Sequence, residues 1–457
     1  MTEEPLMEKL VALCKRRGFV YPSSEIYGGL NGLWDFGPLG VELKRNIKEL
    51  WWRSMTQLRD DIVGLDGSIL MNRAVWKAST HEEQFVDWLV DCKVCKARFR
   101  TDQLADARCP QKPSKRPGEC GGELTEPRRF NLLFRTYVGP LEEESSLTYL
   151  RPETAQAIFV QFRNVLETSR KKIPFGIAQI GKSFRNEVNP RNFLFRSREF
   201  EQMEVEYFVR PGTGLEELEK WKESRLAWYE SIGLPRQHIH VRDVPEGERA
   251  FYSEKTYDLE YTFPFGRQEL EGIAYRTDFD LRQHAVASGK PLEYFDEETG
   301  QKYIPHVIEP SGGVDRTFLA ILCEAYDEEN VVAEGGKVEK RVVLHLSPRV
   351  APIKAGVFPL VKNNEELVRK AREVADLLRG HLRIFYDESG AIGRRYRRMD
   401  EVGTPFGVTI DFETLEGART GPFAGEKETV TVRERDSMRQ ERVRIAELLE
   451  DLRLRVS

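Results

Sequence analysis

Residues 180–208 carry the clearest strand pattern in the chain, because runs of β-forming residues with alternating polar and apolar positions flank a polar loop. This pattern predicts strand, loop and strand. Side chains alternate between the two faces of a strand, so Arg185 and Glu187 are expected on one face of the first strand. One face of the second strand is expected to carry Arg198, Phe200, Gln202 and Glu204. Guanidinium, aromatic ring and carboxylate on one surface suit a ligand with a phosphate, a base and an amine.

Residues 305–322 form a second informative pattern, in which a strand and two glycines precede an amphipathic helix with Arg316 in its first turn. The N-terminus of a helix attracts anions through its free N–H groups and its dipole. An arginine beside it predicts an anion site at this point of the chain.

The remaining patterns indicate how the chain is organised. Residues 1–90 begin with an amphipathic helix, and a glycine-rich turn then leads into a long helical pattern through Trp51 and Trp52. Residues 209–268 read as a helical insertion followed by strands, and residues 325–341 turn acidic and glycine-bearing, as a linker would. Beyond them strands alternate with helices, which predicts a compact α/β domain of about 115 residues.

Length and composition restrict the class of protein. A chain of 457 residues is long enough for two or three domains with substantial cores. Charged residues make up 32% of it, and no apolar run approaches the length that spans a membrane. The N-terminus does not resemble a secretory or mitochondrial presequence, so a cytoplasmic protein without a membrane partner is expected.

The net charge of −5 argues against indiscriminate binding of nucleic acid, but not against a local basic patch. Arginines 394, 395, 397 and 398, with Tyr396 among them, form such a patch. A charge run is usually a solvated helix face, whereas arginine with an interleaved aromatic favours phosphates and unstacked bases. The sequence leaves both interpretations open.

Four of the six cysteines, Cys92, Cys95, Cys109 and Cys120, lie within residues 91–125. In a cytosolic protein such clustering favours a structural zinc site over disulfides, since four thiolates complete a tetrahedral site. The alternative is a reduced and empty cluster. The other two, Cys14 and Cys323, lie on apolar helix faces and are expected to be inert core residues.

Two of the segments above resemble motifs of a known class. FRNE (184–187) with FRSREFEQME (195–204) is similar to motif 2 of the class II aminoacyl-tRNA synthetases, and EPSGGVDR (309–316) to motif 3. The residues of the two motifs are most similar to those of the homodimeric glycyl-tRNA synthetases. Five further blocks follow that family's order: GLWDFGPLGVELKRNIKELWW, ARFRTD, RPETAQ, ELEGIAYRTDFDL and GRRYRRMDEVGTPF.

The resemblance implies an α+β fold in two parts. Residues 1–335 would form a class II catalytic domain, an antiparallel sheet flanked by helices, with a zinc-ribbon-like insertion at 91–125 and a helical insertion at 209–268. Residues 341–457 would form an α/β anticodon-binding domain. The helix through Trp51 resembles motif 1, which builds a homodimer interface; the alternative is an ordinary core helix.

The resemblance also implies the reaction. Glycine and ATP would form glycyl-adenylate and pyrophosphate, and glycine would then pass to the 3′-terminal adenosine of tRNA(Gly). Arg185 and Arg316 would be the catalytic residues, neutralising phosphate charge as planar bidentate donors. Phe200 would stack on adenine and Glu187 would accept from its amine. Because activation needs no proton transfer, no general base is expected.

Individual site residues follow from the matching motif positions. ATP would be bound by Arg185, Asn186, Glu187, Phe195, Arg196, Ser197, Arg198, Glu199, Phe200, Glu269, Leu270, Gly313, Val314, Asp315 and Arg316. Glycine would be bound by Arg100, Glu153, Phe200, Glu201, Gln202, Met203, Glu204, Glu309, Pro310, Ser311, Gly312 and Gly313. Glu269 would also hold Mg²⁺, which prefers oxygen ligands. Two positions have ordinary alternatives: Arg100 as a surface residue of the cysteine segment, and Glu153 as a carboxylate that complements a helix dipole.

Three departures from the family pattern stand out. Glu271 and Tyr275 replace a bulky residue and an aspartate in the ELEGIAYRTD block, and the loop at 413–429 is longer than expected. Two other functions therefore stay open: a non-catalytic paralogue that binds nucleic acid, and an ATP-dependent ligase for another small acid without a tRNA step. Retention of Arg185, Glu187 and Arg316 argues against the first, and the anticodon-like domain argues against the second.

Overall fold

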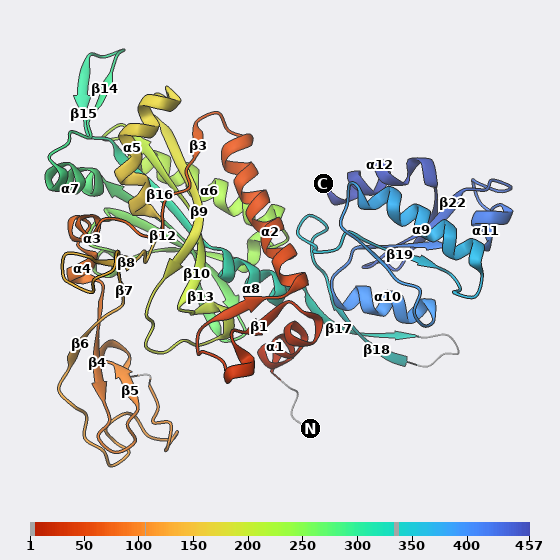
Figure 1. The fold of residues 1–457 in the computed structure, drawn as a ribbon, viewed down its shortest axis with the longest axis horizontal. Helices are drawn as coiled ribbons and strands as arrows, with labels where there is room; N and C mark the ends of the chain where they lie inside the picture. Colours follow the sequence, from red (N-terminus) through yellow and green to blue (C-terminus); the bar gives the residue numbers. More distant parts are fainter. Residues whose placement is uncertain (1–4, 106, 333–337) are drawn as a thin grey trace.

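A computed structural model describes residues 5–105, 107–332 and 338–457. Its centre is a seven-stranded sheet in the order β11-β12-β13-β16-β10-β9-β3 (Figure 1). Neighbouring strands are antiparallel except β3, which pairs with β9 in parallel. The strands are β3 (Ile62–Gly64), β9 (Phe175–Phe184), β10 (Glu199–Val209), β11 (Ile239–Asp243), β12 (Lys255–Phe263), β13 (Gly266–Thr277) and β16 (His306–Gly313). The predicted antiparallel sheet is thereby confirmed.

Helices cover this sheet through two apolar clusters. The helices are α1 (Leu6–Arg17), α2 (Pro38–Trp52), α5 (Ala155–Ser169), α6 (Gly214–Ser231), α7 (Phe279–Ser288) and α8 (Val314–Ala325). The larger cluster joins α1, α2, α6 and α8 to the middle of the sheet, and Leu43, Trp221 and Phe318 are among its buried residues. A second cluster joins α5 and α7 to β9 and β10, with Phe162 4.5 Å from Phe208 between ring centroids. Cys14 and Cys323 lie in the larger cluster, as predicted.

The motif 3 segment folds as predicted, whereas the motif 2 strands are shorter than predicted. The helix α8 begins directly after the two glycines, so Arg316 lies in its first turn. β9 ends at Phe184 and β10 begins at Glu199, so Arg185, Glu187 and Arg198 lie in the loop. The Arg185 amide donates to the Arg198 carbonyl at 2.9 Å, and the Arg198 amide donates to Gly32 at 2.8 Å, because the chain leaves the ladder there to meet the glycine-rich turn.

Residues 209–268 are not a separate insertion. They form α6 and then β11 and β12, the last two strands at one edge of the central sheet. The strand runs pair in register from Ile239 with Tyr261 to Asp243 with Tyr257, which buries alternate aromatic residues. The connection between these strands therefore lies at the edge of the central sheet.

The described part of the predicted linker is a hairpin. β17 (Tyr326–Val332) and β18 (Val338–Leu344) pair antiparallel along their whole lengths, while residues 333–337 lie outside the described residues. The valines that end β17 and the VVL run that ends β18 are β-forming residues and suit a paired ladder better than an open linker.

The cysteine segment projects from the part of the chain that contains the central sheet (Figure 1). It is anchored by a three-stranded sheet of β4 (Val86–Asp91), β5 (Arg98–Arg100) and β6 (Arg128–Asn131), in the order β5-β4-β6. Short elements connect it to the rest: α3 (Arg73–Ala78), α4 (His81–Gln84), β7 (Phe134–Tyr137) and β8 (Leu147–Leu150). Two small hairpins also belong to this part of the chain, formed by β1 (Val20–Pro22) with β2 (Trp34–Phe36) and by β14 (Tyr294–Asp296) with β15 (Gln301–Tyr303).

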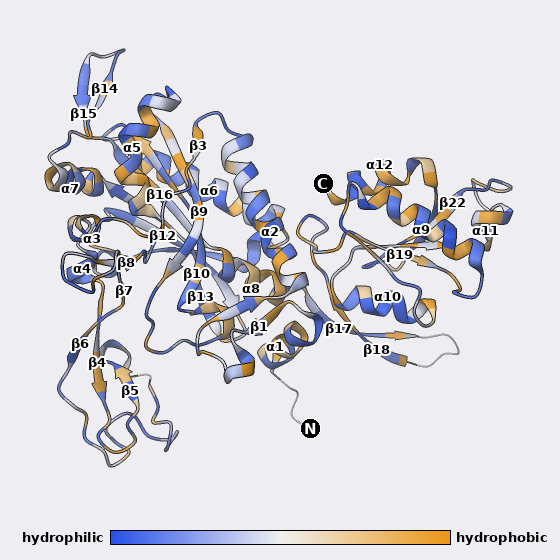
Figure 2. Ribbon diagram, viewed as in Figure 1, coloured by the Kyte–Doolittle hydropathy of each residue, from blue (hydrophilic) through white to orange (hydrophobic). Residues whose placement is uncertain are grey.

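The C-terminal residues form a second sheet with its own apolar cluster. Five strands run in the order β20-β19-β21-β22-β23, parallel across β20, β19 and β21 and antiparallel beyond. They are β19 (Ala355–Pro359), β20 (Ile384–Tyr386), β21 (Phe406–Ile410), β22 (Thr429–Glu434) and β23 (Gln440–Arg444). The helices are α9 (Glu365–Arg379), α10 (Ile392–Glu401), α11 (Phe412–Glu416) and α12 (Ile445–Val456). Apolar residues of β19 and β21 pack against α9 and α12, and Figure 2 shows the hydrophobic residues of β19.

The arginine run lies on α10, which is largely hydrophilic in Figure 2, but it is not simply an exposed patch. Arg395 is buried and donates to the carbonyl oxygens of Gly390 and Pro359. Arg398 pairs with Asp387, and Arg397 lies 3.6 Å from Asp400. Only Arg394 of the four is exposed. The helix is thus held to its domain by its arginines, which neither interpretation of the sequence predicted.

Among the described residues, no helix is long and apolar enough to cross a membrane.

Candidate active site

A cavity of about 410 Å³ opens over the middle of the central sheet. The loop between β9 and β10, strands β10, β13 and β16, the first turn of α8 and the β11–β12 connection all border it. Motif 2 and motif 3 meet here because β10 pairs with β16, with Gln202 opposite Gly313. The volume lies in the range typical of small-molecule sites.

Most of the predicted site residues border this cavity. They are Arg185, Glu187, Phe195, Arg196, Ser197, Phe200, Glu269, Gly313, Asp315 and Arg316 from the ATP set, and Glu153, Glu201, Gln202, Glu204, Glu309, Ser311 and Gly312 from the glycine set. Their position brings them together, but their roles in binding stay a prediction.

The other predicted residues do not border the cavity. Leu270, Met203, Val314 and Pro310 are buried, so neighbouring residues of the same motifs reach the cavity instead. The backbone amide of Asn186 donates to the Leu132 carbonyl at 2.8 Å, and the Glu199 side chain pairs with Lys182. The Arg198 guanidinium donates to the carbonyl oxygens of Glu187 and Asn31, away from the cavity. These side chains support the motif 2 loop.

Arg100 also lies outside the cavity, on β5 of the cysteine segment. Its guanidinium lies 3.3 Å from Asp87 and 2.8 Å from Asp102. Burial opposes its charge, yet Asp102 and Asp87 hold the pKa of Arg100 above its usual value, with a further contribution from Glu187. The interaction with Glu187 shows that the cysteine segment approaches the rim of the site.

The two predicted catalytic arginines are held against aromatic rings. The Arg185 guanidinium lies 5.4 Å from the centroid of Phe85 and 5.3 Å from that of Phe200. Its Nε donates to the Pro152 carbonyl at 3.1 Å. The Arg316 guanidinium lies 4.4 Å from the Phe195 centroid, and its Nη1 lies 3.3 Å from Glu269 Oε1. Both cations are positioned at the cavity before any ligand enters.

Three carboxylates gather at the other end of the cavity: Glu153, Glu204 and Glu309. The helix α5 begins at Ala155, so Glu153 precedes its N-cap Thr154. Burial opposes ionisation of Glu153, yet His81, 3.2 Å away, and Arg276 hold its pKa below the usual range. Glu153 is therefore a fixed negative charge.

The pKa values of Glu204 and Glu309 are raised, in contrast to that of Glu153. Burial and the charge of Glu153 raise the pKa of Glu204, against a hydrogen bond from Thr154. Burial raises the pKa of Glu309 to about 8, although Arg276 donates to its carboxylate. Carboxyl groups shifted in this way bind a proton or a cation readily.

Several cavity residues were missed from the sequence. Strand β11, its connection to β12 and the facing part of β12 contribute Arg242, Glu248, Arg249, Tyr252 and Asp258. No motif marks this segment, and its assignment to an insertion hid it. Arg276 was also missed: it is fully buried behind the cavity, 2.8 Å from Asp280 and 3.8 Å from the Tyr252 centroid. Its place within the ELEGIAYRTDFDL block is the signal that could have identified it.

The two departures from the family pattern have structural partners. Glu271 accepts from Arg225 of α6 at 2.6 and 3.1 Å, and both side chains are 1% exposed. Tyr275 Oη bonds with His306 Nδ1, and the Tyr275 ring occupies the space left by Gly214, where a Cβ would lie 2.3 Å away. Both residues connect elements within the fold.

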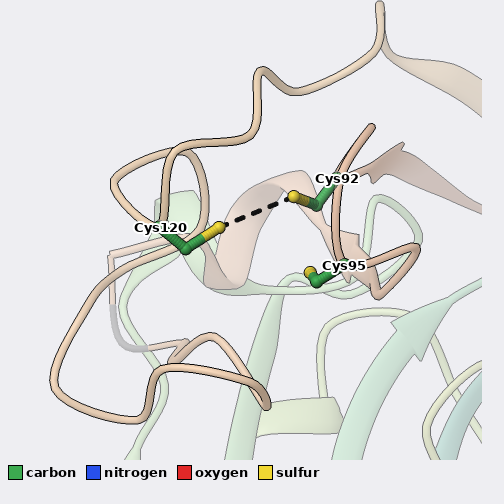
Figure 3. Close-up of side chains that lie close together, drawn as sticks. All are labelled: Cys92, Cys95 and Cys120. Atoms are coloured by element: carbon green, nitrogen blue, oxygen red, sulfur yellow. Dashed lines mark hydrogen bonds between the residues drawn. The ribbon is translucent and has the colours of Figure 1, made fainter.

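The four clustered cysteines are brought together in the projecting segment. Cys92 Sγ and Cys120 Sγ lie 3.6 Å apart, and Cys95 faces them (Figure 3). The sulfurs of these three lie within 4.8 Å of one another. Cys109 interacts with Cys95 and Cys120, and all four are free thiols.

Comparison with known proteins agrees with this architecture. Residues 137–326 match the tRNA synthetase class II core domain (G, H, P, S and T), and residues 354–454 match the anticodon binding domain. The first match covers β9, β10, β16 and α8, the elements that build the cavity. Both matched parts of the chain thus place it among the class II aminoacyl-tRNA synthetases.

Relatives identify the family within that class. The chain is 54% identical over 453 residues to the glycine--tRNA ligase of Thermobifida fusca, covering 96% of each chain. It is 50% identical to that of Treponema denticola, covering 98% of this chain and 97% of the relative, and 50% identical to that of Clostridium perfringens, covering 98% of each. The protein belongs to the glycine--tRNA ligase family.

Proposed function

We propose that the cavity is where glycine and ATP react to form glycyl-adenylate and pyrophosphate, before glycine is transferred to the 3′-terminal adenosine of tRNA(Gly). The observation that carries this assignment is the meeting of Arg185 and Arg316, 131 positions apart, at one cavity with buried carboxylates at its other end. Anionic phosphates complement the first end and an ammonium group complements the second.

The ATP end provides charge and aromatic surface. Arg185 donates to the α-phosphate and the substrate carboxylate, and Arg316 donates to the distal phosphates. Phe200 provides the ring against which adenine stacks. Because both arginines are already positioned, they stabilise negative charge in the transition state without reorganising. No general base is part of this proposal.

The acidic end binds the ammonium group of glycine through Glu153, Glu204 and Glu309. Larger amino acids are rejected by steric exclusion, since favourable contacts alone separate small side chains by only about 1–3 kcal/mol per methylene.

Mg²⁺ fits beside Glu269 and Asp258. Burial and the charge of Glu269 raise the pKa of Asp258 to about 6, so these carboxylates are close enough to repel each other. A divalent cation relieves such repulsion, and magnesium takes one or two carboxylates together with phosphate oxygens. When bound, it would neutralise phosphate charge.

The cysteine segment fits a structural zinc ion held by Cys92, Cys95, Cys109 and Cys120. Tetrahedral Zn–S bonds of about 2.3 Å separate the sulfurs by about 3.8 Å, close to the spacing seen between Cys92 and Cys120. A zinc site would hold the loops of this segment, which otherwise has a very small apolar cluster.

We assign the remaining roles by domain. Residues 1–335 form the catalytic domain, with residues 91–125 as its zinc-type insertion, and residues 341–457 bind the anticodon region of tRNA. A homodimer forms through the segment around α2, where Ile26, Tyr27 and Leu30 are 89%, 87% and 57% exposed. Large exposed apolar patches mark interaction sites. The family membership supports a cytoplasmic site of action.

Glycine-dependent ATP–pyrophosphate exchange without tRNA, in parallel with alanine and serine, tests the assignment. Exchange with glycine alone is expected. A folded protein that gives no exchange with any amino acid would instead be the non-catalytic paralogue. A ligase for another acid would release AMP without tRNA, whereas this protein should need tRNA for repeated turnover.

A further inference from the structure

Glu206 has no role in the site described so far, although it lies directly behind it. It follows Glu204 by two residues on β10 and is 0% exposed. Neither carboxyl oxygen of Glu206 has a hydrogen-bond partner within residues 5–105, 107–332 and 338–457. Burying an ionised carboxylate without a partner costs free energy, so we expect Glu206 to bind a proton or to lie beside a cation.

Strand pairing places Glu206 beside two residues of the acidic end. The register joins Glu204 with Ser311 and Tyr207 with Ile308, so Glu206 lies next to Glu309 across the ladder. One carboxylate oxygen from each of Glu204, Glu206 and Glu309 lies within 4.8 Å of the others. We call these three residues the glutamate cluster.

Negative charges around the glutamate cluster outnumber the positive charges. Burial and Glu309 raise the pKa of Glu206 well above its usual value, and Arg276 of β13 only partly opposes them. The Arg276 guanidinium is already bound by Asp280 and Glu309. The remaining titratable groups that face this region are Glu153, His81, Tyr252, Asp280 and His284. Near neutral pH the cluster therefore retains a proton in the absence of ligand.

We propose that Glu206 is a positioning residue of the glycine site that shares a proton with Glu204 and Glu309, and that the ammonium group of glycine releases this proton when it binds. The inference rests on the proposed placement of glycine at the acidic end. The proton passes from a carboxyl group to solvent, the N–H groups of the ammonium replace it as donors, and no covalent bond in the substrate changes.

This exchange determines how glycine affinity depends on pH. Protons compete with the ammonium group, so affinity rises as pH increases and levels off once the free cluster is ionised. For one released proton the dissociation constant changes by at most about tenfold per pH unit. ATP binding, at the other end of the cavity, should not follow this profile.

Titration calorimetry of glycine into the full-length protein tests the inference. At about pH 7, measurements in phosphate and Tris buffers report the released protons through the different ionisation heats of the buffers. Wild-type protein is expected to release about one proton. The E206Q side chain keeps the shape of glutamate but cannot ionise, so this variant should release less than about half a proton. The pH dependence of its glycine affinity should also shift to lower pH, because Glu204 and Glu309 lose a like-charged neighbour.

Two further variants separate the possible outcomes. Glu216→Gln, an exposed carboxylate of α6, should behave as wild type. A binding heat that is identical in both buffers for wild-type protein would overturn the inference without any variant. If E204Q binds glycine as tightly as wild type, the glycine site itself is misplaced and the proposed function of the cavity fails. If E204Q loses glycine while wild-type protein releases no proton, only the shared proton is refuted.

Discussion

Arg276 organises the acidic end of the cavity from behind. It holds Asp280 by two hydrogen bonds of 2.8 Å, donates to Glu309, and packs on the Tyr252 ring. It thereby orients Glu309, one of the carboxylates proposed to bind glycine, while Glu153 and Glu204 also border the cavity. A buried cation shared among several carboxylates leaves net negative charge, which is what an incoming ammonium group requires.

Replacement of Arg185 by lysine should show whether its planar fork is used. Lysine keeps the charge but cannot donate bidentately or stack between Phe85 and Phe200. We expect glycine-dependent pyrophosphate exchange to fall by about 10²–10³-fold, as when one preorganised donor is removed. Arg191→Lys, in the exposed part of the same loop, is the matched control. Equal activity of the two variants would contradict the role given to Arg185.

Three elements are joined at one buried lysine. Lys44 of α2 lies 2.7 Å from Asp315 of α8 and 2.8 Å from Glu201 of β10, and the Glu201 amide donates to Asp315 at 2.7 Å. Burial alone would lower the pKa of Lys44, but the two carboxylates raise it. Asp315 precedes Arg316, and Glu201 follows Phe200, so this contact connects the predicted dimer helix to both ATP motifs.

Lys44→Met should therefore affect ATP more than glycine. Without the ammonium group, Asp315 and Glu201 repel each other and the first turn of α8 shifts. We expect the KM for ATP in the exchange assay to rise by about tenfold, equivalent to about 1.4 kcal/mol, with a smaller change for glycine. Lys48→Met is the control, since Lys48 is more exposed than Lys44 and forms an ion pair with Glu201 at 2.9 Å. Parallel changes in both KM values would indicate general unfolding instead.

Helix α6 is attached to the sheet by the buried pair of Arg225 and Glu271. Glu271→Ala leaves an unpaired buried cation and should destabilise the protein by about 3–5 kcal/mol. Arg225→Met combined with Glu271→Leu should recover most of this loss, because an apolar pair avoids the cost of burying charge. Urea unfolding followed by tryptophan fluorescence measures both. If the double variant is as unstable as the single one, packing rather than charge is responsible.

At the scale of the whole molecule, the β17–β18 hairpin connects the part with the central sheet to the part with the C-terminal sheet. Arg341 of β18 is fully buried and donates to Asp400 of α10 at 2.9 Å and to the Arg435 carbonyl at 2.6 Å. Arg16 and Arg17 of α1 pair with Glu401 of the same helix. The arginine helix α10 is therefore part of the contact between the two halves, which leaves Arg394 as the exposed arginine of this helix.

Metal analysis of purified protein should show about one zinc per chain if the four thiolates share one ion. Cys109→Ser should lose most of the metal and melt the projecting segment, whereas Cys323→Ser should keep it. Mass spectrometry of the native protein and limited proteolysis near residues 91–125 measure these effects. A folded protein without metal would contradict the zinc site.

Local sequence was sufficient where chemistry and secondary structure coincide in short segments. The two glycines before α8, the clustering of the cysteines and the strand pattern of residues 200–204 each predicted a correct local arrangement, whereas Arg185, Glu187 and Arg198 were expected on strands and lie in the loop between β9 and β10. Prediction failed where a side chain's role depends on distant partners. The arginines of α10 were read as a patch, and the segment 209–268 as an insertion, because the sequence does not show which groups Arg395 meets or which sheet β12 joins.

The strand that carries Glu204 and the helix that carries Arg316 were determined by the order of amino acids alone, since strand and helix periodicity act over a few residues. The buried charge balance was decided only by the tertiary structure. Arg276, Glu206 and Asp258 acquire their surroundings from strands and helices distant in sequence, and burial there changes the cost of each charge. Proton affinity at the acidic end is thus a property of the assembled sheet.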